Sequence, residues 1–231
     1  MEEKKIEEMD VVFLMDRFGY AKTVDVSVYE RNKEAADTEN RYILTCKNTD
    51  KICIFTNKGQ MHLLKVLDLP YGKFRDKGIP IDNLSNYNSS EENFIYIINL
   101  GAIIHSRLLF GTKTAMLKMV DGSEFDVAKR TTASTKLNED DELLIVHAMT
   151  GEETVVMQSE KEMFLRIEAS TIPEKKKGAV GVRGMKLGAG DALAAIYLLN
   201  AEDVVNIEVK GKEVALNRLR TAGRDTKGNK R

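Results

Sequence analysis

The sequence has few cysteines, few prolines and no long apolar run. Its 231 residues include two Cys and three Pro. The two cysteines, Cys46 and Cys53, exclude a disulfide-stabilised scaffold and indicate a reducing compartment. No apolar run approaches the ~20 residues that a membrane-spanning helix requires. The start of the chain, residues 1–10, is charged and acidic, and we therefore expect no signal peptide.

An excess of charge of one sign is also lacking. The 35 basic residues nearly balance 36 acidic ones, giving a formal net charge of −1. Taken as a total, this balance argues against a nucleic-acid partner, which basic proteins bind most readily. The hydrophobic fraction of 42% is high enough for a sizeable core, so the chain is expected to fold as one large domain or two small ones.

What the sequence does contain is a series of short apolar runs. Most are four to seven residues long, rich in Val, Ile, Leu and Phe, and bounded by Gly, Asn, Asp or Lys. An amphipathic helix would show a 3.6-residue period over ten or more residues, which few stretches supply. The runs therefore predict the strands of an all-β sandwich, barrel or propeller. Residues 189–199 have the Ala and Leu of a short helix, and a strand is only slightly favoured there.

One unit recurs along the chain: an apolar strand, a polar turn, a second strand that carries a basic residue, and a polar exit. Its five copies, the last of them looser, are residues 11–29, 51–70, 107–125, 154–173 and 204–223. The turns are 40 to 55 residues apart and centre on Gly19, Gly59, Thr114, Lys161 and Gly211. Such a period predicts propeller blades, because one blade cannot bury both of its faces alone and must stack on others.

Basic residues gather in the segments that follow the hairpins. Three, three, five and six of them fall in residues 71–80, 128–136, 174–187 and 218–231, respectively. The acidic residues concentrate elsewhere, in residues 1–10, in a loop expected at residues 30–40 and in residues 139–142. If equivalent segments of successive blades share one rim, that rim is basic, and its Arg and Lys side chains would neutralise phosphates.

We predict that duplex DNA contacts the basic residues of these segments. The candidates are Lys73, Arg75, Lys77, Lys129, Arg130, Lys175, Lys176, Lys177, Arg183, Lys186, Arg224 and Lys227. Residues 178–184 and 223–228 pair the charge with glycine, which lets backbone N–H groups approach phosphate oxygens. Neither is a nucleotide-binding motif, because the first has the spacing G-x-x-G-x-x-G and Asn229 stands where a P-loop requires Lys. A solvated turn is the alternative interpretation of each.

Groups suited to catalysis or metal binding are sparse. The three histidines are dispersed, and His62, inside an apolar strand, is expected to have a structural role. Cys46 and Cys53 lack the second pair of ligands that a zinc site needs. The acidic run at residues 139–142 is interpreted as a solvated loop rather than a metal site. Without any hydrolase or kinase motif, the sequence predicts no catalytic residue, no metal site and no cofactor in this chain.

Five stretches resemble, in order and in spacing, the C-terminal domain of the A subunit of bacterial type IIA DNA topoisomerases. They are residues 16–22 (DRFGYAK), 55–70 (FTNKGQMHLLKVLDLP), 78–84 (GIPIDNL), 179–187 (AVGVRGMKL) and 223–228 (GRDTKG). The resemblance covers roughly residues 10–228. It implies an all-β, propeller-like β-pinwheel of about five, or six, four-stranded blades that exchange strands. It also implies that the outer basic rim binds and bends duplex DNA.

The resemblance further implies three parts: an acidic segment at residues 1–9, a single β-pinwheel DNA-binding domain at 10–228 and a basic tail at 229–231. Nothing resembles a cleavage domain with its tyrosine or an ATPase domain, so the chain would be a non-catalytic part of a type II topoisomerase that uses ATP and Mg. Its partners would be double-stranded DNA, the ATPase B subunit, and the rest of the A subunit. No membrane partner is expected, the isolated domain would be a monomer, and its location would be cytoplasmic and nucleoid-associated.

One departure from the family pattern concerns the branch. Gyrase A subunits carry a box resembling QRRGGRG after the first hairpin, whereas residues 30–37 here read ERNKEAAD, without glycine and with added acid. This departure and the five repeats favour a topoisomerase IV A subunit over a gyrase A subunit. The competing interpretation is a propeller-like protein-interaction scaffold with a merely solvated basic face. An enzyme with a site in a central channel would need a cluster of His, Asp or Glu that the sequence lacks.

Overall fold

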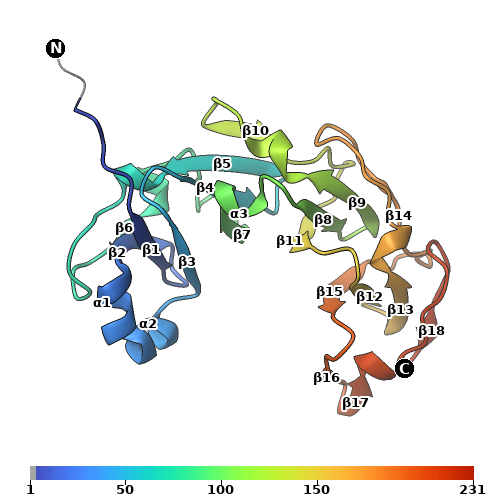
Figure 1. The fold of residues 1–231 in the computed structure, drawn as a ribbon. Helices are drawn as coiled ribbons and strands as arrows, with labels where there is room; N and C mark the ends of the chain where they lie inside the picture. The colour runs from blue at the N-terminus through green and yellow to red at the C-terminus, as the bar shows by residue number, and fades with distance from the viewer. Residues whose placement is uncertain (1–3) are drawn as a thin grey trace.

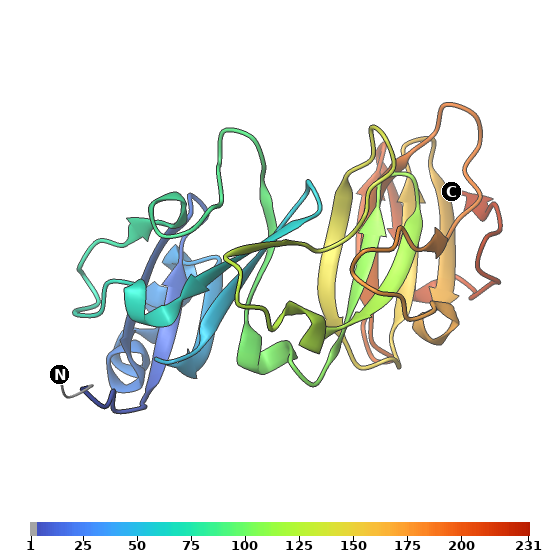
Figure 2. The ribbon, with the colours of Figure 1, turned by 90° about the horizontal axis from the view of Figure 1, so that it is seen from above.

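The computed structural model describes residues 4–231, which form an open arc of antiparallel β-sheets (Figures 1 and 2). Four sheets have four strands each, and the fifth has two. The predicted β-pinwheel class is confirmed, with four complete blades and a fifth that consists of one hairpin. The chain begins at one end of the arc and finishes at the other (Figure 2).

A hairpin at each of the five sequence repeats forms the centre of each blade. The hairpins are β1 (Asp10–Met15) with β2 (Tyr20–Asp25), β4 (Lys51–Thr56) with β5 (Gln60–Lys65), β8 (Arg107–Thr112) with β9 (Met116–Asp121), β12 (Thr154–Ser159) with β13 (Met163–Glu168), and β16 (Asn206–Val209) with β17 (Lys212–Ala215). Each tip has a residue with a positive φ, namely Gly19, Gly59, Ala115, Glu162 and Gly211, and at the fifth tip the preceding Lys210 has one too. In the third and fourth hairpins this residue lies one position beyond the expected turn centre.

The remaining two strands of each complete blade come from different parts of the chain. The inner strand follows its own hairpin: β3 (Tyr42–Lys47), β7 (Phe94–Asn99), β11 (Leu143–Met149) and β15 (Leu193–Leu199). The outer strand follows the next hairpin: β6 (Ile79–Pro80), β10 (Thr131–Ala133), β14 (Val182–Arg183) and β18 (Asn229–Lys230). This is the strand exchange that the resemblance implies. Residues 229–231, expected to form a tail, therefore contain the outer strand of blade 4.

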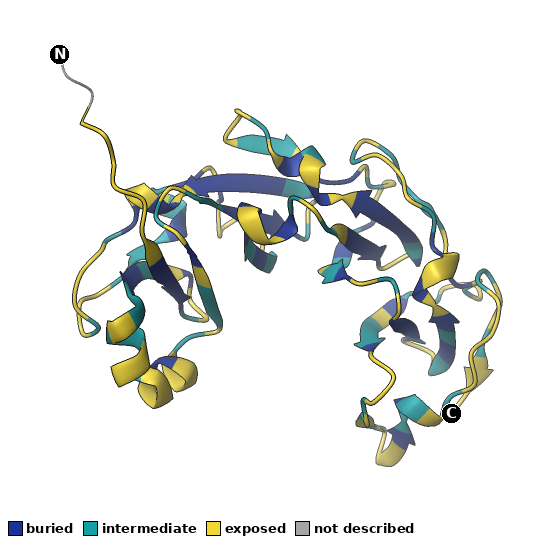
Figure 3. Ribbon diagram, viewed as in Figure 1, coloured by how far each residue is buried: buried dark blue, intermediate teal, exposed yellow. Residues whose placement is uncertain are grey.

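The hydrophobic core consists of layers between successive blades. Alternate residues of one strand face different layers: Ile54 of β4 packs against blade 1, and its neighbour Phe55 packs against blade 3. The central strands are accordingly buried on both faces while the peripheral loops are exposed (Figure 3). Burial on both faces explains why the apolar runs of the sequence are continuous rather than alternating.

The two ends of the arc are covered in different ways. The outer face of blade 1, with Val12 and Leu14, packs against α1 (Val26–Arg31) and α2 (Lys33–Glu39). The far face of blade 4 is covered by Val214 and Leu216 of the fifth hairpin and its exit. The helices replace the acidic loop expected at residues 30–40. Their Ala, Glu and Lys residues favour a helix, a signal too short to show a clear period.

The other helical elements are single turns. They are α3 (Leu100–Ile103), η1 (Val66–Asp68), η2 (Ile81–Asn83), η3 (Gly122–Phe125), η4 (Ala169–Thr171) and η5 (Leu216–Arg218). Within the part of the chain that the structure describes, no helix has both the length and the apolar character needed to cross a membrane.

Candidate nucleic-acid interface

The segments that lead into and contain the outer strands form the convex side of the arc, which we call the outer rim. These segments are residues 71–80, 128–136, 174–187 and 218–231. Figure 1 shows the outer strands on the convex side and the inner strands β3, β7, β11 and β15 on the concave side. The four basic segments of the sequence thus lie on one side of the molecule.

Glycines bring three of the rim segments against their blades. Gly78, Gly181 and Gly228 directly precede β6, β14 and β18. A Cβ atom would lie 2.6 Å from the Leu117 carbonyl oxygen at Gly181, and 2.3 Å from the Phe164 carbonyl oxygen at Gly228. Both glycines also have positive φ, of +104° and +71°. These glycines are therefore explained by packing of the rim rather than by contact with phosphate.

Gly178, in contrast, is a rim glycine with open space around it. A Cβ atom at this position would meet no heavy atom within 4 Å. Its backbone therefore remains accessible to a ligand such as a phosphate group.

A buried lysine fixes the rim segment of blade 3. Lys118 of β9 is 1% exposed, and its Nζ donates hydrogen bonds to the carbonyl oxygens of Lys176, Lys177 and Ala179 at 3.0, 3.2 and 2.7 Å. Burial lowers the pKa of Lys118 to about 8. The side chain thus holds the backbone of a basic segment from beneath, while the side chains of Lys175 and Lys176 in that segment remain exposed.

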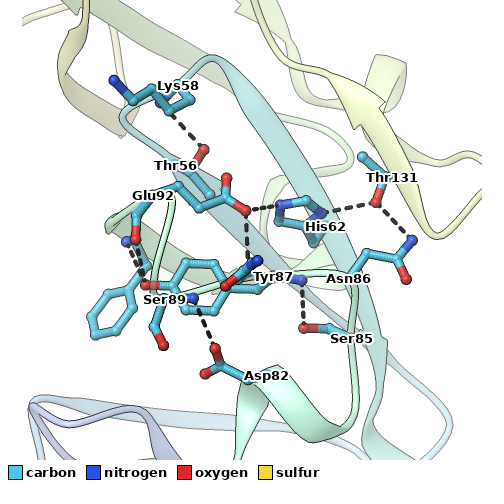
Figure 4. A network of polar contacts seen from close by, with 12 residues as sticks. Thr56, Lys58, His62, Asp82, Ser85, Asn86, Tyr87, Ser89, Glu92 and Thr131 are labelled. Atoms are coloured by element: carbon cyan, nitrogen blue, oxygen red, sulfur yellow. Dashed lines mark hydrogen bonds and ion pairs between the residues drawn. The ribbon is translucent and has the colours of Figure 1, made fainter.

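Blades 1 and 2 also place a basic side chain at the equivalent position, three residues after the hairpin tip, and in blade 1 it too binds rim backbone. Lys22 Nζ donates to the carbonyl oxygen of Asp76 at 2.9 Å. In blade 2 the position is taken by His62, whose Nε2 lies 2.8 Å from the Glu92 carboxylate and whose Nδ1 lies 2.8 Å from Thr131 Oγ1 (Figure 4). His62 is 4% exposed, and both ring nitrogens have a partner, as its predicted structural role requires.

Eight of the twelve predicted contact residues keep their charged groups available. Within residues 4–231 their side chains make no hydrogen bond or ion pair, and all eight are exposed. They are Lys73, Arg75, Lys77, Lys129, Lys175, Lys176, Lys186 and Lys227. Each of the four complete blades contributes at least one of them through its rim segment.

The other four predicted residues are engaged within the protein. The Arg183 guanidinium binds Asp225 through two hydrogen bonds, of 2.6 and 3.0 Å, and holds the pKa of that carboxyl below its ordinary value. Arg224 donates to the carbonyl oxygen of Arg183 at 2.9 Å. Arg130 donates to the Leu84 carbonyl oxygen at 3.0 Å, and Lys177 Nζ to the Glu124 carbonyl oxygen and Thr132 Oγ1 at 3.2 Å each.

The acidic run at residues 139–142 is a solvated loop only in its first half, where Glu139 and Asp140 are exposed. Asp141 is 6% exposed and accepts a hydrogen bond from the backbone N–H of Thr114 at 3.1 Å. Glu142 pairs with Lys58 and Lys113 at 2.9 and 3.0 Å, and these lysines hold its pKa below the ordinary value. Glu142 therefore neutralises lysines at two hairpin tips. Across residues 4–231, no three His, Cys, Asp or Glu side chains are placed to share a metal ion.

Successive blades that exchange outer strands, with cations along the convex rim, define a β-pinwheel. A family model described as "DNA gyrase C-terminal domain, beta-propeller" matches residues 106–148 and 153–200. The two matches correspond to the hairpins and inner strands of blades 3 and 4. The relationship predicted from the sequence, to the C-terminal domains of type IIA topoisomerase A subunits, is confirmed.

Similarity to individual proteins extends over nearly the whole chain. The DNA gyrase A subunit of Lawsonia intracellularis is 28% identical over 98% of the chain, and that of Staphylococcus epidermidis is 27% identical over 98%. The chain spans only 27% to 30% of the length of these relatives.

Solved structures share the fold. The C-terminal domain of a DNA topoisomerase IV matches with a TM-score of 0.84 and 23% identity, over 97% of this chain and 73% of that one. The ParC C-terminal domain of E. coli matches with 0.77 and 14%, over 96% of this chain and 94% of that one. A DNA gyrase A C-terminal domain matches with 0.61 and 17%, over 96% and 76%.

Proposed function

We propose that this chain is a DNA-binding and DNA-bending domain of a type IIA topoisomerase A subunit. The observation that carries the proposal is the set of eight exposed, unengaged cations among residues 4–231, which follow one convex rim across four blades. Lys and Arg side chains that contact phosphates bind DNA without regard to sequence and position it on the protein. The net charge of −1 does not oppose such binding, because the basic residues are concentrated in the rim segments.

Bending follows from the shape of the rim. A duplex that contacts the cations of several blades has to follow the convex side of the arc, which a straight duplex touches only locally. The elastic cost of bending would be offset by the additional phosphate contacts that the bend allows. In the parent enzyme the domain would hold a duplex in this bent form and so guide strand passage, in which one duplex segment passes through another that is cleaved in both strands.

The parent protein would be an ATP-dependent type II topoisomerase. The gyrase relatives are between three and four times as long as this chain, and ATP and Mg would bind parts that lie outside it. The partners would be duplex DNA, the ATPase B subunit, and the remainder of the A subunit, in the cytoplasm at the nucleoid. The isolated domain would be a monomer. Helices α1 and α2 in place of a glycine-rich box support the topoisomerase IV branch.

Titration of a fluorescent duplex with the chain at increasing salt tests the proposal. The duplex has to be long enough to reach all four complete blades, and two unrelated sequences should bind equally. We expect the logarithm of the affinity to fall linearly with the logarithm of the salt concentration. Absence of binding at low salt, or an affinity indifferent to salt, would reject DNA binding and leave a protein-interaction scaffold.

Two further measurements separate the finer parts of the proposal. Energy transfer between dyes at the duplex ends should increase on binding if the DNA bends. Ligation of a nicked plasmid in the presence of the chain reports wrapping: a shift in linking number indicates the gyrase branch, and binding without a shift indicates the topoisomerase IV branch.

A further inference from the structure

The β1–β2 tip of blade 1 is the one hairpin tip, among the five in the described chain, that carries aromatic side chains. Phe18 is 70% exposed and Tyr20 is 47% exposed. The other tips read NKGQ, KTAM, EKEM and KGK. Two neighbouring exposed rings gain little from folding, so their position indicates a contact with another molecule.

A hollow of about 590 Å³ lies beside these two rings. Its lining combines the aromatic side chains Phe18, Tyr20 and Phe74 with the cationic side chains Lys22, Arg75 and Lys77. Arg75 and Lys77 belong to the unengaged cations of the outer rim, so the hollow adjoins the proposed path of DNA. The guanidinium of Arg17 lies 4.7 Å from the centre of the Phe18 ring and adds a further cation at the tip.

Two of the carboxylates around the hollow are used to shape its walls. Asp16 Oδ1 accepts hydrogen bonds from the backbone N–H groups of Phe18 and Tyr20, at 2.9 and 3.1 Å. Asp76 Oδ2 accepts one from the backbone N–H of Lys73 at 2.9 Å. Glu39, at the end of α2, is the third carboxylate of the lining. The lining therefore has three acidic and three basic side chains, and Arg75 and Lys77 are the two cations of the lining that make no side-chain hydrogen bond or ion pair within residues 4–231.

We propose that this hollow binds unpaired or unstacked nucleotides of the DNA that lies on the rim. The inference rests on the proposed DNA binding and adds a site to it. Exposed aromatic rings beside cations are the arrangement that stacks bases and neutralises the adjoining phosphates. The faces of the bases are covered in an intact duplex, so Phe18 and Tyr20 reach them only at a gap, a bulge or a kink where the stack opens. The hollow thereby favours locally opened DNA.

The test compares an intact duplex with the same duplex carrying a two-nucleotide bulge, each titrated with the full chain at one salt concentration. We expect the bulged duplex to bind ~10-fold more tightly, the gain typical of stacking about one base. A fluorescent adenine analogue placed in the bulge should be quenched on binding. The Phe18→Ser/Tyr20→Ser variant should lose both the preference and the quenching. Val204→Ser, which removes a 76% exposed apolar side chain on the fifth blade, is the control and should keep both.

The outcomes are distinct. Equal binding of intact and bulged duplexes by the wild-type chain overturns the site while the proposed DNA binding stands. A preference that survives in Phe18→Ser/Tyr20→Ser also overturns it, because the greater flexibility of a bulged duplex then explains the gain. Failure to bind either duplex at low salt rejects the proposed function itself. A hollow that instead docks a protein would show no difference between the two duplexes in any variant.

Discussion

Blade 1 and the junction of blades 3 and 4 both present basic residues on the outer rim, but they hold them differently. Arg75 and Lys77 of blade 1 have no partner within the described chain, whereas Arg183 is bound to Asp225 by two hydrogen bonds. Arg224 is bound to the backbone of Arg183. Equal charge in the sequence therefore corresponds to unequal availability on the surface. Arg183 and Arg224 hold adjacent segments of the junction together, whereas the cations of blade 1 remain available to phosphate.

The largest change in duplex affinity is expected from charge reversal on blade 1, whose cations are available to phosphate. The variant Lys73→Glu/Arg75→Glu/Lys77→Glu should weaken duplex binding ~100-fold at low salt, because three phosphate contacts become repulsive. The control Arg31→Glu/Arg41→Glu/Lys47→Glu changes the net charge equally, on α1 and at the two ends of the inner strand β3, away from the rim segments. It should weaken binding by less than ~3-fold, since screening limits charges that lie beyond contact distance. Equal losses in fluorescence anisotropy titrations would show that total charge, rather than the rim, governs binding.

The buried lysines beneath the two regions allow a second comparison. Lys118→Met removes the donor for three carbonyl oxygens, and the free energy of unfolding should fall by ~2 kcal/mol. Lys22→Met should cost less, because Lys22 is only partly buried and water can replace its hydrogen bonds. Urea denaturation followed by circular dichroism measures both. A larger loss for Lys22→Met would contradict the assignment of Lys118 as the main anchor.

The wild type and Lys118→Met should also differ in pH dependence. The pKa of Lys118 is lowered from 10.5 to about 8, so above pH 8 the folded chain releases this proton while the unfolded chain retains it. The unfolded state then binds more protons, and the contribution of Lys118 to stability rises with pH up to 10.5. The difference in unfolding free energy between the wild type and Lys118→Met should therefore grow between about pH 8 and about pH 9.5. A difference that stays constant would mean that Lys118 has an ordinary pKa.

Two glycines of one rim segment should differ in how much stability the same substitution costs. Gly181→Ala places a Cβ atom 2.6 Å from the Leu117 carbonyl oxygen at a φ of +104°, and we expect a loss of ~2 kcal/mol in unfolding free energy. Gly178→Ala has open space and should change stability by less than ~0.5 kcal/mol. Thermal melts of the two variants measure this difference. Similar melting temperatures would contradict the inference that close packing requires glycine at position 181.

The five hairpins could be predicted from the sequence because their strands are buried on both faces and leave continuous apolar runs. The outer strands could not. β6 is two residues long, and its Pro80 pairs with Tyr20, 60 positions earlier in the chain. Its place is fixed by the partner strand and by the close approach of Gly78, which no local pattern reports. Helices α1 and α2 were missed for a related reason: their seven or fewer residues are stabilised by packing on Val12 and Leu14.

The candidate interface could be located from the sequence but not resolved residue by residue. The basic segments follow each hairpin, and strand exchange carries all of them to the convex side. Whether a given cation is available depends on contacts between segments far apart in sequence. Arg183 and Asp225 are separated by 42 positions, and the parallel bridge between Met185 and Thr226 brings them together. Composition alone treats Arg183 and Arg75 as equivalent, and only the folded chain distinguishes them.

The smallest expected effect is the most direct check of that distinction. Asp225→Asn removes the partner of Arg183, so the guanidinium becomes available, and duplex affinity should rise ~2-fold. Loss of a negative charge on the rim would by itself also strengthen binding, so the substitution is repeated in an Arg183→Gln background. If release of Arg183 causes the gain, the gain disappears there, and a double-mutant cycle gives the coupling between the two residues. An equal gain in both backgrounds would mean that Arg183 never reaches the DNA and that its only role is to join blades 3 and 4.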